Sequence, residues 1–383
     1  MVTAVLSIVL LTRNVGGDAQ VGVGARHSAS GADDGPRIGI DIRRFGAVCD
    51  GRHDDRSALE DAVEAAMENG GGIVAVPPGR CRILATAKDP FVRLGDNVSL
   101  VGAGASRSFL ELDADEGDSY RELLRTDGSN ISISDLTLTR AGGVYSVMVR
   151  IQEGRNISFR QIRVDGRRSD FSEGTVHGLT VADEGAIENV VLQNIEVRDV
   201  QYGFLQTNKA ETELSGVLVD RSVFEGNSAE DLSFNSPNGE MTAVTVQNSR
   251  FTGGGGFAVS LANVHGAVLR GNTFDGYAKE FVHIEDRSSD VQVIDNTFSG
   301  KKPSKDEWYS YVMVINGSTD VTIANNRFEI TDWDERFRCV YVGPGGSDFP
   351  APTEISLVDN EVDAHGAVTL VDAYGGAGVR VHE

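Results

Sequence analysis

Apolar and polar residues alternate with a period of two in nine short segments of the chain. Each segment is nine residues long, and successive segments lie 23 to 34 residues apart, beginning at Asn130, Asn156, Asn189, Gly216, Ala243, Gly266, Asp290, Asp320 and Glu354. Successive side chains of a strand point to opposite faces of its sheet, so this alternation predicts strands with one face on a core. We interpret each segment as one strand.

A second apolar-alternating segment follows most of these strands. The second segments cover residues 178–182, 231–235, 258–262, 281–285, 311–315 and 367–371. Two or three short strands in every 23 to 34 residues are typical of a solenoid, in which each coil adds one strand to every sheet. The Asn-Gly and Asp-Gly turns of β-hairpins are not systematic here. We therefore predict an all-β, right-handed parallel β-helix solenoid.

Two positions of the repeat predict ladders that run along the solenoid. The ninth position holds large apolar residues: Leu138, Val164, Val197, Phe224, Phe251, Phe274, Phe298, Phe328 and Val362. The seventh position becomes asparagine in the later segments, at Asn272, Asn296, Asn326 and Asn360. Asparagine tolerates left-handed backbone geometry, and its amide can hydrogen-bond the asparagine of the next coil.

One helix is predicted ahead of the strands, between Ser57 and Gly70. Ser57 and Glu60 have the spacing of a capping box, and Gly70 to Gly72 end the helix. Its apolar stripe consists of Leu59, Ala62, Val63, Ala66 and Met67. The end of a solenoid exposes apolar core and unpaired strand edges, so we expect an N-terminal capping helix.

Three cysteines are too few for a disulfide scaffold. Cys49 and Cys81 flank the helix, and whether they pair is left open. Cys339 lies in an apolar strand and is expected to be buried.

Composition and the N-terminal segment narrow the class of protein. Lys+Arg 35 against Asp+Glu 57 gives a net charge of -22, which argues against nucleic acid or an anionic membrane surface as partner. Residues 2–11 are apolar like the h-region of a signal peptide, without a preceding Lys or Arg, and a Gly/Ser/Asp-rich stretch follows. We expect residues 1–37 to be a signal-like segment and flexible linker. Residues 38–383 are expected to be a single β-helix domain of a secreted protein.

The stretch FGAVCDGRHDDRSALEDAVEAAMENGGGIVAVPPGRCRI, residues 45–83, closely resembles the N-terminal signature of the pectate-lyase-like superfamily. The resemblance continues through GDNVSLVGAGA at 95–105 and the coils, and covers residues 38–383. It implies a right-handed β-helix. Polysaccharide lyases, polygalacturonases, mannuronan epimerases and phage tailspikes share this signature, so it also implies contact with acidic or complex polysaccharides, without specifying the chemistry.

Within the superfamily, NVVLQNIEVRDVQYGF at 189–204 resembles a stretch of the mannuronan C-5 epimerases that ends in Tyr-Gly-Phe-Asp-Pro-His. Tyr202 matches the catalytic tyrosine of that motif, whereas Leu205 replaces the acid and Thr207 the histidine. The arginine of the epimerases aligns with GGGGF at 253–257 and is absent. The segment AEDLSF, 229–234, resembles the acidic pair of polygalacturonases, but their His-Gly and Arg-x-Lys motifs do not follow.

Polar side chains that face outward around the second strands supply the catalytic candidates, namely His177, Tyr202, Glu230, Asp231, His283 and Glu285. A Tyr/His pair suits β-elimination, in which a uronate loses its C5 proton and the leaving oxygen gains one. Two carboxylates instead suit the acid and base of glycoside hydrolysis. The structural alternatives are a packing role for Tyr202 and a mutual ion pair between His283 and Glu285.

The binding candidates are the outward strand residues Asn208 and Asn235 and the loop residues Arg167, Arg168, Lys305, Trp308 and Tyr309. Cations suit uronate carboxylates and aromatic rings suit sugar faces, although solvated edge loops have the same composition. No metal cluster or obligatory cofactor is predicted, with Ca²⁺ left open, and a homotrimer is a further expectation. The sequence thus predicts an extracellular enzyme that cleaves or remodels an acidic polysaccharide, with a lyase favoured over a glycoside hydrolase. The alternative is a non-catalytic polysaccharide-binding β-helix of the adhesin kind.

Overall fold

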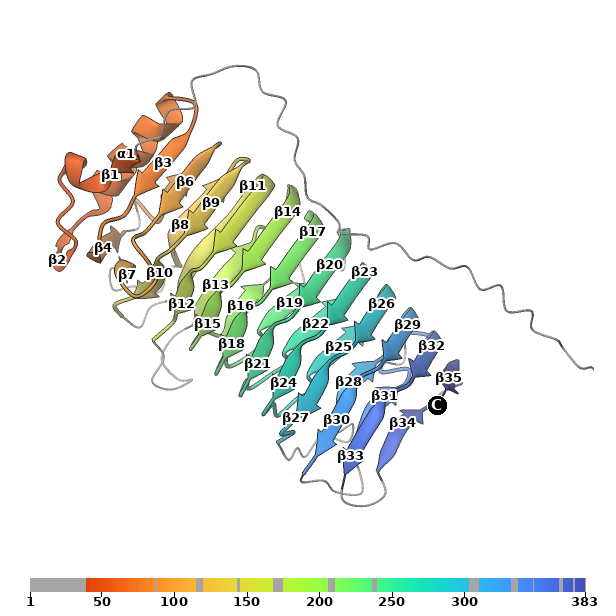
Figure 1. Cartoon of the computed structure of the whole chain (residues 1–383). Coiled ribbons are helices and arrows are strands. Elements are labelled where there is room, and N and C mark those ends of the chain that lie inside the picture. The colour runs from red at the N-terminus through yellow and green to blue at the C-terminus, as the bar shows by residue number, and fades with distance from the viewer. Residues whose placement is uncertain are drawn as a thin grey trace, which may run out of the picture. The chain divides into compact units, whose positions relative to one another are not determined.

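The computed structural model describes residues 39–86, 88–114, 120–142, 145–167, 175–205, 211–235, 240–302, 310–331, 337–346, 348–364, 368–374 and 376–382. The described part from residue 39 onward is a parallel β-helix, as the sequence predicts (Figure 1). Its strands run along three faces, which we call sheets A, B and C. The predicted signal-like segment and linker lie outside the described residues.

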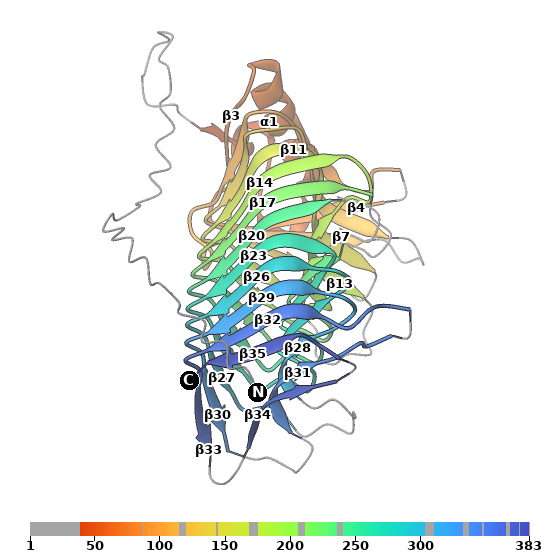
Figure 2. The ribbon, with the colours of Figure 1, turned by 90° about the vertical axis from the view of Figure 1, so that its right-hand side faces the viewer.

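The three sheets are built from one short strand per coil, and each strand pairs in parallel with the strand of the next coil (Figure 2). Sheet A contains β1 Ile40–Asp41, β3 Gly72–Ala75, β6 Val98–Val101, β9 Ile131–Ser134, the second half of β11 Ser146–Arg160, β14 Ala186–Gln193, β17 Glu213–Asp220, β20 Met241–Gln247, β23 Val264–Arg270, β26 Ser289–Ile294, β29 Thr319–Ala324, β32 Thr353–Val358 and β35 Val379–His382.

Sheet B contains β2 Asp50–Asp54, β4 Gly79–Ala85, β7 Ser108–Ala114, β10 Thr137–Arg140, β12 Arg163–Asp165, β15 Glu196–Arg198, β18 Val223–Glu225, β21 Arg250–Thr252, β24 Thr273–Asp275, β27 Thr297–Ser299, β30 Arg327–Ile330 and β33 Glu361–Ala364. Sheet C contains β5 Val92–Leu94, β8 Arg121–Asp127, the first half of β11, β13 Val176–Val181, β16 Tyr202–Leu205, β19 Leu232–Asn235, β22 Val259–Ala262, β25 Val282–Glu285, β28 Ser310–Val314, β31 Arg338–Val342 and β34 Thr369–Ala373. Strand β11 runs from sheet C into sheet A and so joins the two.

Each nine-residue repeat forms two strands rather than the single strand that its alternation predicts. The second to fifth residues extend in sheet A, and the last two begin a strand of sheet B, as in β9 and β10. The first and sixth positions of all nine repeats have φ between 50 and 79°, so the chain bends at the sixth position. Asn, Asp and Gly occupy most of these positions because they adopt left-handed geometry at low cost.

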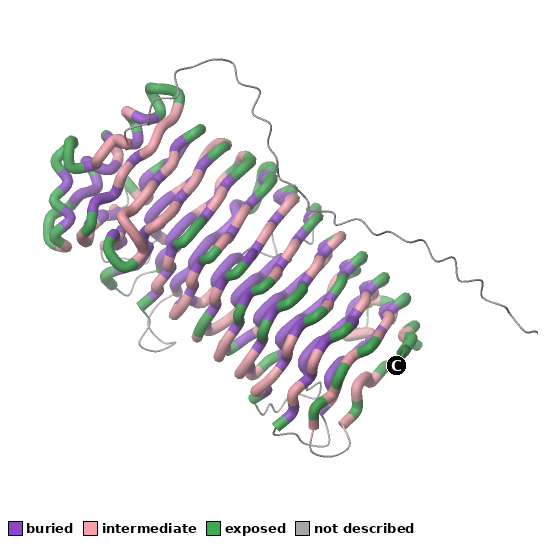
Figure 3. Tube along the Cα trace, viewed as in Figure 1, coloured by how far each residue is buried: buried purple, intermediate pink, exposed green. Residues whose placement is uncertain are grey.

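The two predicted ladders form inside this framework. The ninth-position residues are paired in register from coil to coil, and the rings of Phe224, Phe251, Phe274, Phe298 and Phe328 stack at centroid distances of 4.9 to 5.1 Å. The amide of Asn272 donates to Asn296 at 3.1 Å, and Asn296 donates to Asn326 at 3.0 Å. The left-handed residue is the one before each of these asparagines, for example Asp295. Burial accordingly alternates along the coils (Figure 3).

The helix α1, Arg56–Glu68, covers the N-terminal end of the described coils together with the 3-10 helix η1, Ile42–Phe45 (Figure 1). Leu59, Ala62, Val63 and Ala66 are buried as predicted, whereas Met67 is 37% exposed. The predicted capping box does not form, because the helix begins at Arg56 after the N-cap residue Asp55. Ser57 is therefore already inside the first turn, and Glu60 forms an ion pair with Arg56 at 2.7 Å instead.

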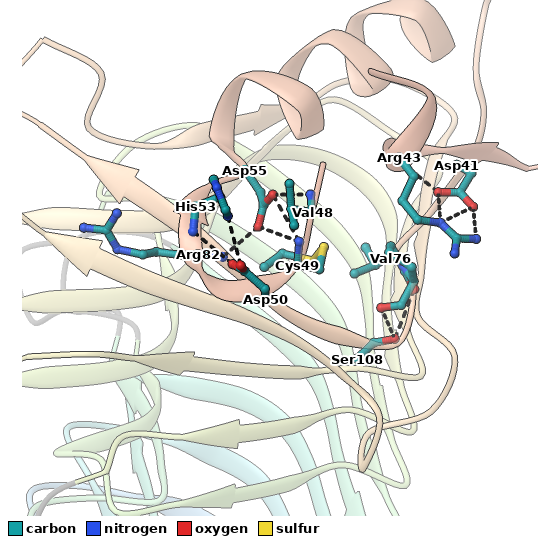
Figure 4. Close-up of a disulfide and its surroundings, with 12 residues drawn as sticks. Asp41, Arg43, Val48, Cys49, Asp50, His53, Asp55, Val76, Arg82 and Ser108 are labelled. Atoms are coloured by element: carbon teal, nitrogen blue, oxygen red, sulfur yellow. Dashed lines mark hydrogen bonds and ion pairs between the residues drawn. A yellow bond between two sulfur atoms is a disulfide. The ribbon is translucent and has the colours of Figure 1, made fainter. Parts of the chain in front are cut away.

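A disulfide between Cys49 and Cys81 ties the segment before the helix to β4 (Figure 4). Next to it, the carboxylate of Asp55 accepts hydrogen bonds from the backbone N–H of Val48 at 2.6 Å, Cys49 at 3.1 Å and Arg82 at 3.2 Å. The Asp55 side chain therefore makes no capping hydrogen bond to the first turn of the helix. The cap is thus cross-linked covalently and by hydrogen bonds to the first coils. Cys339 is buried, as expected.

Candidate functional site

Sheet C presents two rows of side chains on its outer face. The strand pairings place Arg93, Arg125, Arg150, Thr180, Leu205, Ser233, Ser260, His283, Met313, Tyr341 and Asp372 in one row, which we call the central row. Where the chain enters the sheet, the same register gives a second row, which we call the corner row. It contains Glu122, Val147, His177, Tyr202, Glu230, Phe257 and Glu280.

Alternation breaks between these rows, because two consecutive residues of each coil point inward. A Cβ on Gly203 would lie 3.0 Å from the ring of Phe224 in the core, and Phe204 beside it is also fully buried. On the next coil the equivalent residues are Asp231 and Leu232. The prediction that Asp231 joins Glu230 on the outer face is therefore wrong.

Asp231 instead belongs to a hydrogen-bonded group inside the solenoid. The Tyr277 hydroxyl donates to its carboxylate, and the Asn227 amide donates to it at 2.6 Å. Burial raises the pKa of Asp231 to about 7, even though both hydrogen bonds lower it. An enclosed carboxylate of this kind has no access to a polymer on the outer face.

Aromatic rings on four successive coils contact one another in sequence, and two of them, His177 and Tyr202, belong to the corner row. The ring centroids of Tyr120 and Tyr145 lie 5.0 Å apart, those of Tyr145 and His177 lie 5.3 Å apart, and those of His177 and Tyr202 lie 5.2 Å apart. All three contacts are edge to face, which is the favourable geometry for aromatic pairs. Tyr120 and Tyr145 are not among the residues predicted from the sequence, because the predicted second strands begin only at residue 178. Their strands read RELLRTD at 121–127 and SVMVRI at 146–151, without a regular period-two alternation, so the sequence pattern does not place Tyr120 and Tyr145 on the outer face.

His177 and Tyr202 sit on adjacent coils and hold complementary protonation states. Burial lowers the pKa of His177 to about 4, a hydrogen bond with Gln201 opposing it in part, so the imidazole is neutral at neutral pH. Its Nδ1 atom is buried without a hydrogen-bond partner among the described residues. Burial, and then the charge of Glu230, raise the pKa of Tyr202, so the phenol keeps its proton. One member of the pair can therefore accept a proton while the other donates one.

Glu230 follows Tyr202 in the corner row and is mostly buried. Desolvation raises the pKa of its carboxyl group, with the charge of Glu285 acting in the same direction and that of His283 against it. The Oε2 atom has no hydrogen-bond partner among the described residues. Buried polar atoms are nearly always paired in native proteins, so the unpaired oxygen of Glu230, next to Tyr202 in the corner row, makes this stretch a candidate site.

A second titratable cluster surrounds His283 in the central row. Its Nδ1 lies 3.7 Å from Glu280 and its Nε2 lies 3.3 Å from Glu285. Burial by itself lowers the pKa of His283, but the two carboxylates outweigh it and raise that pKa to about 9. The ring of Phe257 stacks on the imidazole at 4.4 Å, and the Lys279 ammonium lies 5.1 Å above Phe257. His283 is thus an imidazolium held in an ion-pair network, which resembles the predicted structural alternative.

The predicted binding residues divide into three groups. Asn235 is in an outer row of sheet C, in register with Ala262 and Glu285, and so lies near the cluster. Arg167 lies against sheet B, where its guanidinium forms an ion pair with Glu111 at 2.9 Å. The remaining candidates, Arg168, Asn208, Lys305, Trp308 and Tyr309, lie outside the described residues.

Two other features of the described residues stand apart from these rows. Cys49, Asp55 and Cys81 place potential metal ligands within 4.8 Å of one another, but the two sulfurs are bonded to each other. A surface hollow of about 320 Å³, lined in part by Arg155, lies on β11, β14 and β17 and not on the outer rows of sheet C. Among the described residues, no helix has the length and apolar character needed to cross a membrane.

Sequence comparison finds relatives that act on uronate polymers. A mannuronan C5-epimerase of Azotobacter vinelandii, AlgE6, is 32% identical over 169 residues, which are 43% of this chain and 17% of that protein. Alginate lyase 7 of the same organism is 27% identical over 170 residues, again 43% of this chain and 17% of the relative. The chain therefore matches only a small part of the length of these relatives.

Structure comparison supports the fold. A tailspike protein mutant of E. coli bacteriophage HK620, in complex with a pentasaccharide, superposes with a TM-score of 0.59 at 13% identity. The superposition covers 90% of this chain and 65% of the tailspike. The profile of the family described as rhamnogalacturonase A/epimerase, pectate lyase-like matches residues 39–281, which include the cap, sheet C up to β22 and the His177–Tyr202–Glu230 row. The chain belongs to this rhamnogalacturonase A/epimerase, pectate lyase-like family.

Proposed function

We propose that the chain is an enzyme that cleaves an acidic, uronate-containing polysaccharide by β-elimination at the corner row of sheet C. The observation that carries the proposal is the pairing of a neutral histidine with a protonated tyrosine on adjacent coils. The ring centroids of His177 and Tyr202 lie 5.2 Å apart, and both side chains belong to the corner row of sheet C, with Tyr202 partly exposed and His177 buried.

β-Elimination needs one group that takes the C5 proton of a uronate and one that protonates the departing O4 oxygen. The neutral imidazole of His177 accepts the C5 proton. The electrons of the C5–H bond form the C4=C5 double bond, the C4–O4 bond breaks, and the Tyr202 hydroxyl gives its proton to O4. The imidazolium then releases its proton to solvent and the phenolate takes one up. The neighbouring Glu230 carboxyl raises the pKa of Tyr202 and so favours this reprotonation.

The relatives support the choice of substrate class. By their names, the alginate lyase and the mannuronan C5-epimerase both act on uronate polymers, and the C5 carbon that an epimerase inverts is also the carbon at which β-elimination of a uronate begins. Leu205, at 8% exposure, occupies the central row where the resembling epimerase motif has its catalytic acid. A group that returns a proton to C5 is therefore missing at that position, which favours elimination over epimerisation.

Hydrolysis is the second candidate, and the state of Glu230 favours it. A buried carboxyl group with a raised pKa is suited to the general acid of a glycosidase, and Glu285 supplies a carboxylate near enough to shift that pKa. Against this assignment, Glu285 is already engaged by the His283 imidazolium at 3.3 Å.

The test is to incubate the purified chain with mannuronan, alginate, polygalacturonate and a neutral glucan. We expect new reducing ends together with the ultraviolet absorbance of an unsaturated uronate on at least one uronate polymer, and neither on the glucan. Reducing ends without that absorbance would establish hydrolysis instead. Inverted uronates detected by NMR in an uncut polymer would establish epimerisation, and binding without any reaction would establish a binding module.

A further inference from the structure

Three arginines, Arg93, Arg125 and Arg150, stand on successive coils in the central row of sheet C. They differ in how closely a carboxylate neutralises each guanidinium. Arg93 pairs with Asp127 at 2.9 Å. Arg125 forms two hydrogen bonds with Glu122, at 2.8 and 2.7 Å, and its guanidinium lies 3.6 Å above the ring of Phe91.

Arg150 has no comparable acidic contact among the described residues. The carboxylate oxygen that pairs with it belongs to Asp183 and lies 4.0 Å away, and the Asp183 side chain is 53% exposed. Its other contacts are with neutral oxygens: Gln152 Oε1 at 3.3 Å and the Tyr120 hydroxyl at 3.4 Å. The side chain is 20% exposed, so the guanidinium is held in place but reachable from outside.

The position of Arg150 relates it directly to the reacting pair. It is in register with Thr180, three residues after His177 on β13. Its charge acts on the Tyr145 phenol, whose ring contacts His177 at 5.3 Å. Arg150, Tyr145 and His177 thus line one stretch of the outer face, with a cation at one side and the proton acceptor at the other.

We propose that Arg150 binds the carboxylate of the uronate whose C5 proton is removed, and that this contact selects uronates over neutral sugars at the site. The assignment rests on the proposed function. A guanidinium presents parallel N–H groups that match both oxygens of a carboxylate, which gives orientation as well as attraction. Withdrawing charge from the carboxylate also favours loss of the adjacent C5 proton. Tyr145 provides an aromatic face beside the bound ring.

The experiment compares Arg150→Gln and Arg150→Lys with the matched control Arg93→Gln, which removes an arginine from the same row two coils away. Binding to mannuronan and to mannuronan whose carboxyl groups have been reduced to alcohols is measured by calorimetry, separately from any cleavage. We expect Arg150→Gln to lose about tenfold to a hundredfold in affinity for mannuronan, the range for hydrogen bonds to a charged group. The loss is expected to be partial in Arg150→Lys, because lysine keeps the charge but not the fork.

The control and the second polymer make the outcome decisive. Arg93→Gln is expected to bind like the wild-type protein, and Arg150→Gln to bind both polymers equally weakly with an unchanged melting temperature. Preference for mannuronan that survives Arg150→Gln would overturn the assignment, as would equal losses in Arg93→Gln and Arg150→Gln. Selective binding that depends on Arg150, without bond cleavage, would support the carboxylate site while refuting the lyase.

Discussion

The outer faces of sheets B and C are built from the same coils but handle charge in opposite ways. On sheet B, charges on adjacent coils neutralise each other. Arg163 pairs with Glu196 and Arg198 pairs with Asp165, each at 2.7 Å, and each pair is directly opposite across the strands.

Sheet C buries titratable groups without such neutralising partners. Among the described residues, Nδ1 of His177 and Oε2 of Glu230 in the corner row are buried without a hydrogen-bond partner, whereas the sheet B atoms in that state include Nε of Arg198 and Oγ1 of Thr252. Burying a polar group without a partner costs free energy on either sheet. The difference teaches that sheet B pairs its charges between adjacent coils, whereas the corner row of sheet C holds a neutral histidine beside a carboxyl group of raised pKa.

The largest effect is expected from removing the hydroxyl group of Tyr202 on sheet C. Tyr202→Phe deletes the proton donor, and we expect the elimination rate to fall about 10²- to 10⁴-fold, the usual contribution of general acid catalysis. Unfolding in urea should change little, because the ring remains beside His177. Tyr374→Phe, at an exposed tyrosine near the C-terminal end, is the matched control and should keep full activity. Equal activity of the two variants would remove Tyr202 from the mechanism.

A second test concerns Asp231, which points into the solenoid although its neighbour Glu230 lies in the corner row. The pKa of Asp231 is raised from 3.8 to about 7, so the folded state binds the proton more tightly and stability falls as pH rises between these values. The shift corresponds to about 4 kcal/mol. We expect Asp231→Asn to flatten the decline in the free energy of unfolding between about pH 4 and pH 7, measured in urea. A decline as steep as in the wild-type protein would contradict the assignment.

The pH profile of cleavage tests the state of His177. Because burial lowers its pKa to about 4, the accepting imidazole should persist until the pH falls to that value. We expect kcat/KM to drop on the acid side near pH 4, about tenfold for each further pH unit. An acid limb near 6.5, where an ordinary histidine titrates, would show that the proton acceptor is not a desolvated His177.

The smallest effect is expected on sheet B. Glu196→Gln breaks the ion pair with Arg163, whose side chain is about a third exposed, so the cost should be at most about 1 kcal/mol. Activity on uronate polymers should be unchanged. A large loss of activity in this variant would erase the distinction between the two faces.

Much of the fold could be predicted because the β-helix repeats its local rules in every coil. Period-two alternation, the apolar ninth position and the asparagine seventh position each recur, and the structure confirms both ladders. The bend at the sixth position was not predicted, because a residue such as Arg221 carries no signal for its φ of 50°. The capping box at Ser57 failed for a similar reason: Asp55 is engaged by a segment that sequence spacing does not place beside it.

The sequence by itself determined the parallel β-helix, its helical cap and the outward position of His177, Tyr202 and Glu230, because these follow from short-range patterns repeated along the chain. Only the tertiary structure decided that Asp231 turns inward to Tyr277 and that Arg150 keeps its charge available while Arg125 does not. Pairing and desolvation depend on which coils are stacked and where each corner bends. Both depend on contacts between residues far apart in the sequence, and they determine the charge and protonation state of each side chain.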